Sequence, residues 1–502
     1  MNSTLVKKLV YYGKKHLGLN DLDSIYVTNV LYRKLHIEYS EDEVDLSYID
    51  ELKVPDVLLD ELRAHIRENN LVSEENIELF IVEIMGDITP LPSQVMNRFL
   101  EIKKEKNALE ACNYLLDLEI KNNYIQKTAV DKNIYWKAKF EDNFLEITIN
   151  MSKPEKNNKD IAKLISAPKT NVKYPKCLLC IENLGYQGRS DHPARENIRI
   201  IPLTLNNEDW FMQYSPYVYY GHHCIVINNK HENMVINKEN MNALLDFVDQ
   251  NNYYFIGSNA DLPIVGGSIL NHNHFQGGSH LMPLMYSKIR YDFYLDKYSD
   301  VKLSYLDWYN STFLIRGKSK TKVLDLASHI LDVWKEYSDE EVDIRAYTDG
   351  VRHNTITPVV RKVDGEYYVY LILRNNRCND VHPDGIFHAH QEYFNIKKEG
   401  IGLIEAMGLF ILPARLKRQM GEVEYLLNNN ISLDEYFIDH EDMIVHKDMI
   451  NYLRNQNGDA KVLIQNYINN VCKEILECTA VFKNTNLGQK HLERFVKALG
   501  GK

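Results

Sequence analysis

The sequence predicts a mixed α/β (α+β) fold, with helical segments at both ends of the chain and strands between them. Residues 1–125 and 413–502 carry apolar residues at the spacing of amphipathic helices. Residues 126–412 contain short runs in which apolar and polar residues alternate, as they do in strands, with helical patterns between the runs. This order of strands and helices is typical of α/β and α+β proteins.

The N-terminal region is expected to form helices packed on one another. Leucines recur among charged residues, as at Leu5, Leu9, Leu31 and Leu35. No group of catalytic side chains stands out here, so the region is predicted to be a helical cap or a dimerisation module. Residues 413–502 return to the same pattern and are expected to form a C-terminal helical segment.

Strand patterns begin at about residue 130. Alternating runs at residues 134–140 and 145–150 precede polar residues 152–159, which are expected to form a loop. Further strands are expected at residues 198–203 and 223–227.

The middle of the chain combines a helix and a strand before its most distinctive motif. A helix at residues 238–252 and a strand at residues 253–257 lead into a histidine-rich segment. After that segment, residues 284–295 and 324–337 have a mixed, helical pattern.

A hairpin is expected in the second half of this region. Residues 356–361 and 367–373 are strand-like and are joined across Asp364-Gly365, a dipeptide favoured in tight hairpin turns. A second His-x-His follows at residues 388–390, and two α/β halves with one such motif each indicate a weak internal repeat.

The chemistry is expected in residues 266–282, where His272, His274 and Gln276 lie between glycine pairs. In an extended segment these three alternate side chains share one face. Glycines let a ligand or another backbone approach closely, and an imidazole can attack phosphorus as a nucleophile. The segment therefore predicts a phosphate site with a catalytic histidine, although surface histidines would give the same His-x-His.

Cys177 and Cys180 form a Cys-x-x-Cys motif, which suits two ligands of a tetrahedral zinc site. No second Cys-x-x-Cys is present, so further ligands would have to be histidines. A redox pair and plain core thiols are the alternatives. Between two predicted strands, Trp210 and Phe211 offer aromatic faces on which a nucleotide base could stack, or they belong to the core.

Length and charge exclude some classes of protein. With 502 residues the chain is long enough for two or three domains, and its net charge of −11 argues against a general nucleic-acid-binding surface. Seven cysteines in so long a chain argue against a disulfide framework. We find no apolar run of signal-peptide length at the N-terminus and none that approaches the roughly 18 residues of a membrane span. A cytoplasmic protein is expected, without nucleic-acid or membrane partners.

Taken together, these motifs resemble galactose-1-phosphate uridylyltransferases, in the class II (bacterial, type 2) form. The resemblance covers nearly the whole chain and is strongest in five stretches that follow one another in the family's order. They are residues 174–180, 223–231, 272–278, 387–390 and 395–412.

The resemblance implies a fold of the histidine-triad type, with two histidine-triad-like halves built on antiparallel sheets. On this basis the chain is divided into a helical N-terminal region (1–125), an N-terminal catalytic half (126–300), a C-terminal half (301–412) and a helical C-terminal segment (413–502). It also implies a homodimer, with UDP-glucose and galactose 1-phosphate as substrates.

The resemblance also implies a mechanism, in which His274 attacks the α-phosphorus of UDP-glucose and carries the uridylyl group. Gln276 stands where related hydrolases have a third histidine. An amide can hold phosphate oxygens but cannot shuttle a proton, which favours transfer between phosphates over hydrolysis. Asn259 and Ser268 resemble the family's phosphate-holding residues.

Further residues are matched to the family by position. Lys398 and Glu405 lie in the stretch that reaches the hexose in class I relatives, although both could simply lie on an exposed amphipathic face. The metal ligands that the resemblance implies are Cys177, Cys180, His231 and His272. They make a structural Zn²⁺ the expected cofactor.

Two departures from class I enzymes affect these expectations. Class I enzymes read His-Pro-His-Gly-Gln where this chain has His-Asn-His-Phe-Gln. Their second metal site needs a glutamate that is absent between Gln276 and Asp292, so iron is not expected. The functional alternatives are a nucleotide phosphorylase and a non-catalytic, nucleotide-binding zinc protein of the same fold.

Overall fold

The computed structural model describes residues 3–151, 174–429 and 431–501. The described chain divides into two compact units, one formed by residues 1–131 and 156–231 and the other by residues 132–155 and 232–502. The loop predicted at residues 152–159 lies outside the described residues, and the predicted domain boundaries stay predictions.

The first unit begins with the predicted helices. They are α1 (Ser3–Tyr12), α2 (Asp21–Lys34), α3 (Asp56–Glu68), α4 (Ile77–Ile88), α5 (Pro92–Glu105), α6 (Ala108–Lys121) and the short α7 (Lys127–Val130). In α3, Leu58, Leu62 and Ile66 recur every four residues and are fully buried, as a helix with one apolar face requires. Leu5 and Leu9 of α1 are buried in the same way.

Three antiparallel strands complete the regular structure of the first unit. They are β3 (Ile201–Leu205), β4 (Glu208–Tyr214) and β5 (Cys224–Asn228), paired in that order. Asn206 and Asn207 both have positive φ and form the two-residue turn between β3 and β4. The sequence predicted β3 and β5 but not β4, whose residues were interpreted only as aromatic faces between strands.

The second unit contains a seven-strand antiparallel array. Its strands, in spatial order, are β7 (His274–Gly278), β6 (Phe255–Gly257), β13 (Asn354–Val363), β14 (Glu366–Asn375), β10 (Thr312–Gly317), β9 (Lys302–Leu306) and β8 (Ile289–Phe293). The predicted hairpin is confirmed, because Val363 pairs with Glu366 and the turn residues Asp364 and Gly365 have φ of 49° and 79°.

Two smaller sheets are separate from this array. The strands β1 (Ile134–Lys139) and β2 (Phe144–Ile149) pair antiparallel as predicted, and β15 (Leu409–Leu412) pairs parallel with β2. A two-strand ribbon joins β11 (Tyr347–Thr348) to β12 (Val351–Arg352).

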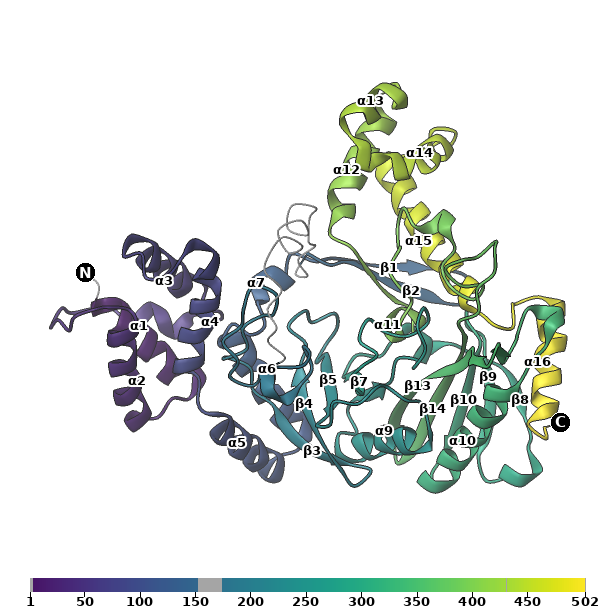
Figure 1. Cartoon of the computed structure of the whole chain (residues 1–502), viewed down its shortest axis with the longest axis horizontal. Helices are drawn as coiled ribbons and strands as arrows, with labels where there is room; N and C mark the ends of the chain where they lie inside the picture. The colour runs from purple at the N-terminus through teal and green to yellow at the C-terminus, as the bar shows by residue number, and fades with distance from the viewer. Residues whose placement is uncertain (1–2, 152–173, 430, 502) are drawn as a thin grey trace. The chain divides into compact units, whose positions relative to one another are not determined.

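The helices of the second unit begin on the array with α9 and α10 and continue beyond it to the C-terminus (Figure 1). They are α9 (Lys238–Gln250), α10 (Lys320–Glu336), α11 (Leu403–Ala406), α12 (Arg415–Asn428), α13 (Leu433–Asp439), α14 (Lys447–Arg454), α15 (Ala460–Thr479) and α16 (Asn486–Ala498). The helix α10 packs on β10, β13 and β14, and Trp334 of α10 is fully buried with its Nε1 donating to the carbonyl of Thr355 at 2.9 Å. No described helix has the length and apolar character that a membrane span requires.

The mixed α/β fold with antiparallel sheets and helical ends is therefore confirmed, with one local correction. Residues 284–295 were predicted to be mixed and helical, but they hold only the short 3₁₀ turn η5 (Pro283–Tyr286) before the strand β8. Ile289, Tyr291 and Phe293 alternate along β8 with the period of a strand. The strand is at the edge of the array and pairs only with β9, a contact that local periodicity does not reveal.

Close packing of β7 against β6 gives a test of the fold at the histidine segment. A Cβ at Gly277 would lie 2.5 Å from the carbonyl oxygen of Phe255, so Gly277→Ala should destabilise the protein by about 1–3 kcal/mol. The matched control is Gly421→Ala in α12, where a Cβ would meet no atom within 4 Å and alanine favours the helix by up to about 1 kcal/mol. Urea unfolding of both variants measures the difference, and a wild-type midpoint for Gly277→Ala would contradict the close packing.

Candidate functional site

In the first unit, two cysteines and a histidine bring their ligand atoms together. The Sγ atoms of Cys177 and Cys180 are 3.6 Å apart, and Nδ1 of His231 is 3.1 Å from Sγ of Cys180. The ligand atoms of these residues lie within 4.8 Å of one another, so they form a candidate metal-binding group. Neither cysteine takes part in a disulfide. Thiolate and imidazole are the donors that zinc prefers, so the donor set fits the predicted ion.

Surrounding groups hold the Cys-x-x-Cys turn in shape. The backbone N–H of Leu179 donates to Sγ of Cys177 at 3.3 Å, an arrangement that favours the thiolate. The buried side chain of Asn183 donates to the carbonyls of Cys177 at 2.9 Å and Cys180 at 2.8 Å, and its Oδ1 lies 2.6 Å from Nε2 of His192. Asn183 therefore holds the backbone of the two cysteines in place, and His192 holds Asn183, a role that the sequence analysis did not assign.

The predicted stacking residues also belong to the first unit. Trp210 and Phe211 are neighbours on β4 and are each 1% exposed. Successive residues of a strand point to opposite faces, so the two rings do not share a face. A role for either ring in binding a base stays a prediction.

The predicted catalytic segment lies in the second unit, at the start of β7. His274 opens this strand and Gln276 follows on the same face, while His272 precedes the strand and is fully buried. Gln276 pairs with Gly257 of β6, so the segment is fixed by the array rather than by a free loop.

One hydrogen bond determines the electronic state of His274. The ring is 6% exposed, and its Nδ1 lies 2.8 Å from the carbonyl oxygen of His272. A carbonyl only accepts hydrogen bonds, so Nδ1 carries the proton and Nε2 of the neutral ring keeps its lone pair. Burial lowers the pKa of His274 to about 4, and the hydrogen bond to His272 only partly offsets it. At neutral pH the ring is uncharged, with its lone pair on Nε2.

Of the two predicted phosphate-holding residues, one is buried and one exposed. Asn259 is 4% exposed and its Oδ1 accepts a hydrogen bond from the backbone N–H of Leu403 at 2.8 Å. A Cβ at Gly267 would lie 2.8 Å from Nδ2 of Asn259, so the amide sits against the glycine pair before the histidines. Ser268 follows this pair and is exposed.

The residues predicted to reach the hexose differ in the same way. Glu405 is buried, and Nζ of Lys397 lies 2.9 Å from its Oε1. Lys397 also donates to the carbonyl of Ile411 at 3.0 Å, whereas Lys398 is exposed. The sequence thus missed Lys397 as the partner of Glu405, because nothing local tells which of two adjacent lysines turns inward.

The second His-x-His does not repeat the geometry of the first. His388 and His390 lie in irregular structure after β14, whereas His274 lies in a strand. Within the described residues, neither histidine belongs to a metal-binding group. His388 instead accepts a hydrogen bond at Nε2 from the backbone N–H of Ile401 at 3.1 Å.

A buried carboxylate that contacts the end of the histidine segment was also missed. Nε2 of His280 lies 2.6 Å from Oε2 of Glu146, whose side chain is 2% exposed, and Nζ of Lys137 lies 3.2 Å from Oε1. Burial would raise the pKa of Glu146, but the hydrogen bonds from His280 and Lys137 outweigh it and lower the pKa. This contact ties the end of the histidine segment to β2, and its partners are too distant in sequence to be matched by spacing.

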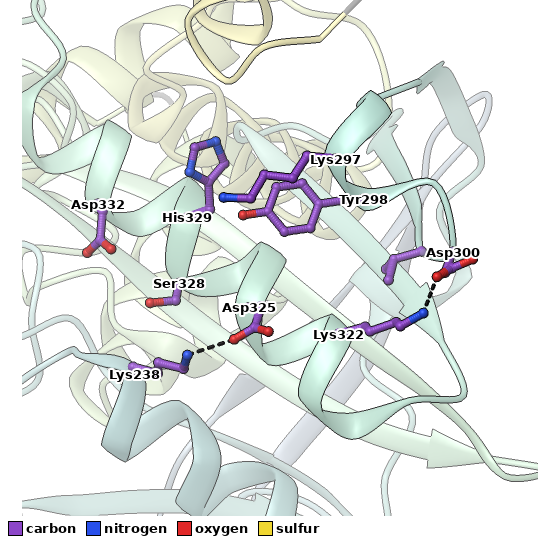
Figure 2. Close-up of a pocket in the computed structure, with 10 residues that line it drawn as sticks. Lys238, Lys297, Tyr298, Asp300, Lys322, Asp325, Ser328, His329 and Asp332 are labelled. Atoms are coloured by element: carbon purple, nitrogen blue, oxygen red, sulfur yellow. Dashed lines mark hydrogen bonds and ion pairs between the residues drawn. The ribbon is translucent and has the colours of Figure 1, made fainter.

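A surface hollow of about 440 Å³ in the second unit lies among other residues (Figure 2). It is bordered by α9, α10 and residues 297–301, and no predicted site residue lines it. Its charges pair locally, as in the 2.6 Å contact of Lys238 with Asp325. We therefore assign it no part in the chemistry.

Comparison with known families assigns the chain. The family model of the galactose-1-phosphate uridyl transferase N-terminal domain matches residues 22–233, and that of the C-terminal domain matches residues 246–442. The chain belongs to the galactose-1-phosphate uridyl transferase family.

Several curated relatives agree over the whole length. The galactose-1-phosphate uridylyltransferase of Fusobacterium nucleatum subsp. nucleatum is 40% identical over 99% of both chains. That of Caldanaerobacter subterraneus subsp. tengcongensis is 41% identical over 99% of this chain and 98% of its own. Among solved structures, yeast Ap4A phosphorylase Apa2 is 11% identical over 60% of this chain and 89% of its own, with a TM-score of 0.30 that supports no argument. The family assignment makes this chain a uridylyltransferase, a nucleotidyltransferase of galactose metabolism.

Proposed function

We propose that this chain transfers UMP from UDP-glucose to galactose 1-phosphate through a uridylyl group held on His274, as a class II member of its family. The observation that carries the proposal is the buried, neutral ring of His274, whose Nδ1–H is committed to His272 and whose Nε2 keeps a lone pair. A cytoplasmic homodimer, as expected from the sequence, is part of the same proposal.

The two half-reactions balance without a proton donor. Nε2 of His274 attacks the α-phosphorus, the bond to the bridging oxygen breaks, and glucose 1-phosphate leaves as a phosphate anion. A phosphate oxygen of galactose 1-phosphate then attacks the same phosphorus, the N–P bond breaks, and UDP-galactose leaves. The leaving group of the first step is a stable phosphate anion, and that of the second step is the neutral ring of His274. General acid catalysis is therefore unnecessary.

Gln276 supports transfer over the alternatives. It lies on the face of β7 that carries His274, and an amide can hold phosphate oxygens without delivering a proton. A phosphorylase would use inorganic phosphate in place of a hexose 1-phosphate. An acceptor panel with UDP-glucose as the donor therefore separates the two activities.

The remaining contacts in the proposal are assigned by chemistry. Asn259 and Ser268 would hold the phosphates, and Trp210 or Phe211 would lie at the base. Glu405 lies 2.9 Å from Nζ of Lys397, and a buried carboxylate can accept hydrogen bonds from sugar hydroxyls.

Zinc is proposed as a structural ion. Cys177, Cys180 and His231 supply three donors, and His272 would supply the fourth. A tetrahedral set of four protein donors has no open position, so the ion would stabilise the fold beside the catalytic segment without entering the reaction.

The nucleophile is tested by substitution and rescue. His274→Ala should lower transfer at least about 10³-fold, because the attacking nitrogen is lost. His274→Gly with added uridine 5′-phosphoimidazolide should regain the second half-reaction, since the free imidazolide supplies that nitrogen. The control is His446→Ala, which removes another fully buried histidine whose pKa is also lowered to about 4 by burial. Substantial turnover of His274→Ala with UDP-glucose would exclude the role.

The metal is tested by elemental analysis of protein prepared without chelators. We expect about one zinc per chain in the wild type, and loss of zinc with a lower melting temperature in Cys180→Ser and His272→Ala, because each removes a donor. Cys112→Ser removes a buried thiol of the first unit outside the group and should keep the ion. A metal-free wild type with full activity and stability would contradict the site.

The hexose contact is tested by steady-state kinetics with galactose 1-phosphate varied. Glu405→Ala should impair its use most, but it also leaves the buried Lys397 with only the 3.9 Å contact to the exposed Glu399, which costs up to about 3–5 kcal/mol of stability. Glu405→Gln keeps the shape and should raise KM with a smaller loss of stability, while deoxy sugars should be poor acceptors for the wild type.

Lys398→Ala and Glu399→Gln complete this comparison. Lys398 is exposed and Glu399 is the more exposed carboxylate of the segment, so both changes should leave the melting temperature unaltered. A raised KM in Lys398→Ala alone would assign the sugar phosphate to that lysine. Near-native kinetics in all of these variants would place the sugar pocket elsewhere.

A further inference from the structure

The segment from Ile401 to Glu405 is held by side chains from three distant parts of the second unit. The backbone N–H of Ile401 donates to Nε2 of His388 at 3.1 Å, and its carbonyl accepts from Nη2 of Arg374 at 2.7 Å. Two residues on, the N–H of Leu403 donates to Asn259 at 2.8 Å. Consecutive backbone groups of a connecting segment are thus satisfied by protein rather than by water.

Burial makes these contacts selective for one conformation of the segment. Arg374 is 1% exposed and His388 is 5% exposed, and Ile401 is fully buried. A buried backbone group that loses its partner carries the whole cost of desolvation. Three hydrogen bonds to buried side chains therefore favour this arrangement of the segment, and Glu405 lies at its end.

The hydrogen bond at His388 needs a neutral ring. Nε2 accepts a hydrogen bond from the backbone N–H of Ile401, which requires that Nε2 itself be unprotonated. Burial lowers the pKa of His388 to about 4, and the charge of Arg374 lowers it further. The acceptor is therefore present throughout the neutral range.

Arg374 combines a structural contact with an electrostatic one. Within the part of the chain that the structure describes, its buried Nε and Nη1 have no hydrogen-bond partner. Burial lowers its pKa to about 10, and the negative charge of Glu405 opposes that effect. Burying a guanidinium that makes one direct hydrogen bond costs stability, because most of its donors lose water without gaining a partner. Its positive charge also interacts with the negative charge of Glu405.

The same segment is tied to the phosphate side of the proposed site. Asn259 accepts from Leu403, and a Cβ at either Gly267 or Gly402 would lie within 2.9 Å of its side-chain amide. Gly267 precedes the catalytic histidines, whereas Gly402 precedes Leu403 at the start of α11. Asn259 thus fits tightly between the two backbone segments.

We propose that Arg374 and His388 are positioning residues, which hold the Ile401–Glu405 segment so that the carboxylate of Glu405 recognises the hexose of the sugar phosphate. This inference rests on the proposed function, because it needs a hexose 1-phosphate in that site. Neither side chain needs to touch the substrate. Their effect should therefore appear in the use of hexose 1-phosphates and not in the chemistry of His274.

The experiment compares a step that contains a hexose with one that does not. Uridine 5′-phosphoimidazolide can uridylylate His274 without any sugar, whereas galactose 1-phosphate must enter the hexose site. We would measure both the rate of labelling by the imidazolide and the KM and kcat for galactose 1-phosphate. The variants are His388→Leu, which removes the acceptor, and His388→Gln, whose amide oxygen can accept from Ile401.

His388→Leu should raise KM for galactose 1-phosphate about tenfold, the factor that a hydrogen bond of about 1.4 kcal/mol represents, with labelling unchanged. His388→Gln should recover most of the loss, and Arg374→Lys, which keeps the charge but loses the fork of donors, should fall between them. His446→Leu is the control for loss of a buried histidine in the same unit and should change neither step.

The outcomes separate this inference from the proposed function. A wild type that is not labelled by the imidazolide and does not use galactose 1-phosphate would overturn the proposed function, and the inference with it. A wild type that does both, with equal losses of labelling and of hexose use in His388→Leu, would show a general structural role and overturn the inference alone. An unchanged KM in a folded His388→Leu would do the same.

Discussion

The hydrogen bond from Nδ1 of His274 to the carbonyl of His272 is the constraint on which the proposed chemistry depends. An imidazole in water exchanges its proton between two nitrogens, and a ring in the wrong tautomer has no lone pair on the nitrogen that must attack. Here the carbonyl of His272, two residues away, accepts a hydrogen bond from Nδ1–H and so keeps the proton on that nitrogen, while burial keeps the ring neutral. The strand β7, which carries His274, is fixed by its pairing with β6. The two strands approach closely at Gly277, where there is no room for a side chain.

Elsewhere in the second unit, two opposite charges lie where few water molecules can screen them. Lys397 and Glu405 are both largely buried and lie 2.9 Å apart, so removal of either would leave a costly unpaired charge. Replacing both by apolar residues would remove that cost, which makes stability a weak reason for the pair to be there. Within the proposed function, a carboxylate that a lysine holds in place explains the pair better, since carboxylates form strong hydrogen bonds with sugar hydroxyls.

The sequence predicted those features that are local. The helices at both ends and the hairpin at Asp364-Gly365 each depend on periodicity or on a turn dipeptide, and they are confirmed. The strand β8 was missed because an edge strand is defined by its partner rather than by its own pattern. Lys397 was missed in favour of its neighbour, and Arg374 and His388 were missed as a pair, because their contacts at Ile401 join residues far apart in the chain.

A nucleophile in a reversible transfer must also be a good leaving group, and the geometry of His274 serves both needs. When Nε2 bonds to phosphorus, the ring keeps its proton on Nδ1 and becomes cationic. The hydrogen bond to the carbonyl of His272 then becomes charge-assisted and stronger, and this would stabilise the uridylylated ring. The buried surroundings oppose the same charge, so the N–P bond stays reactive towards the next phosphate. A glutamine in place of a proton-donating histidine completes this balance, because a phosphate acceptor needs no proton removed, whereas an attacking water does.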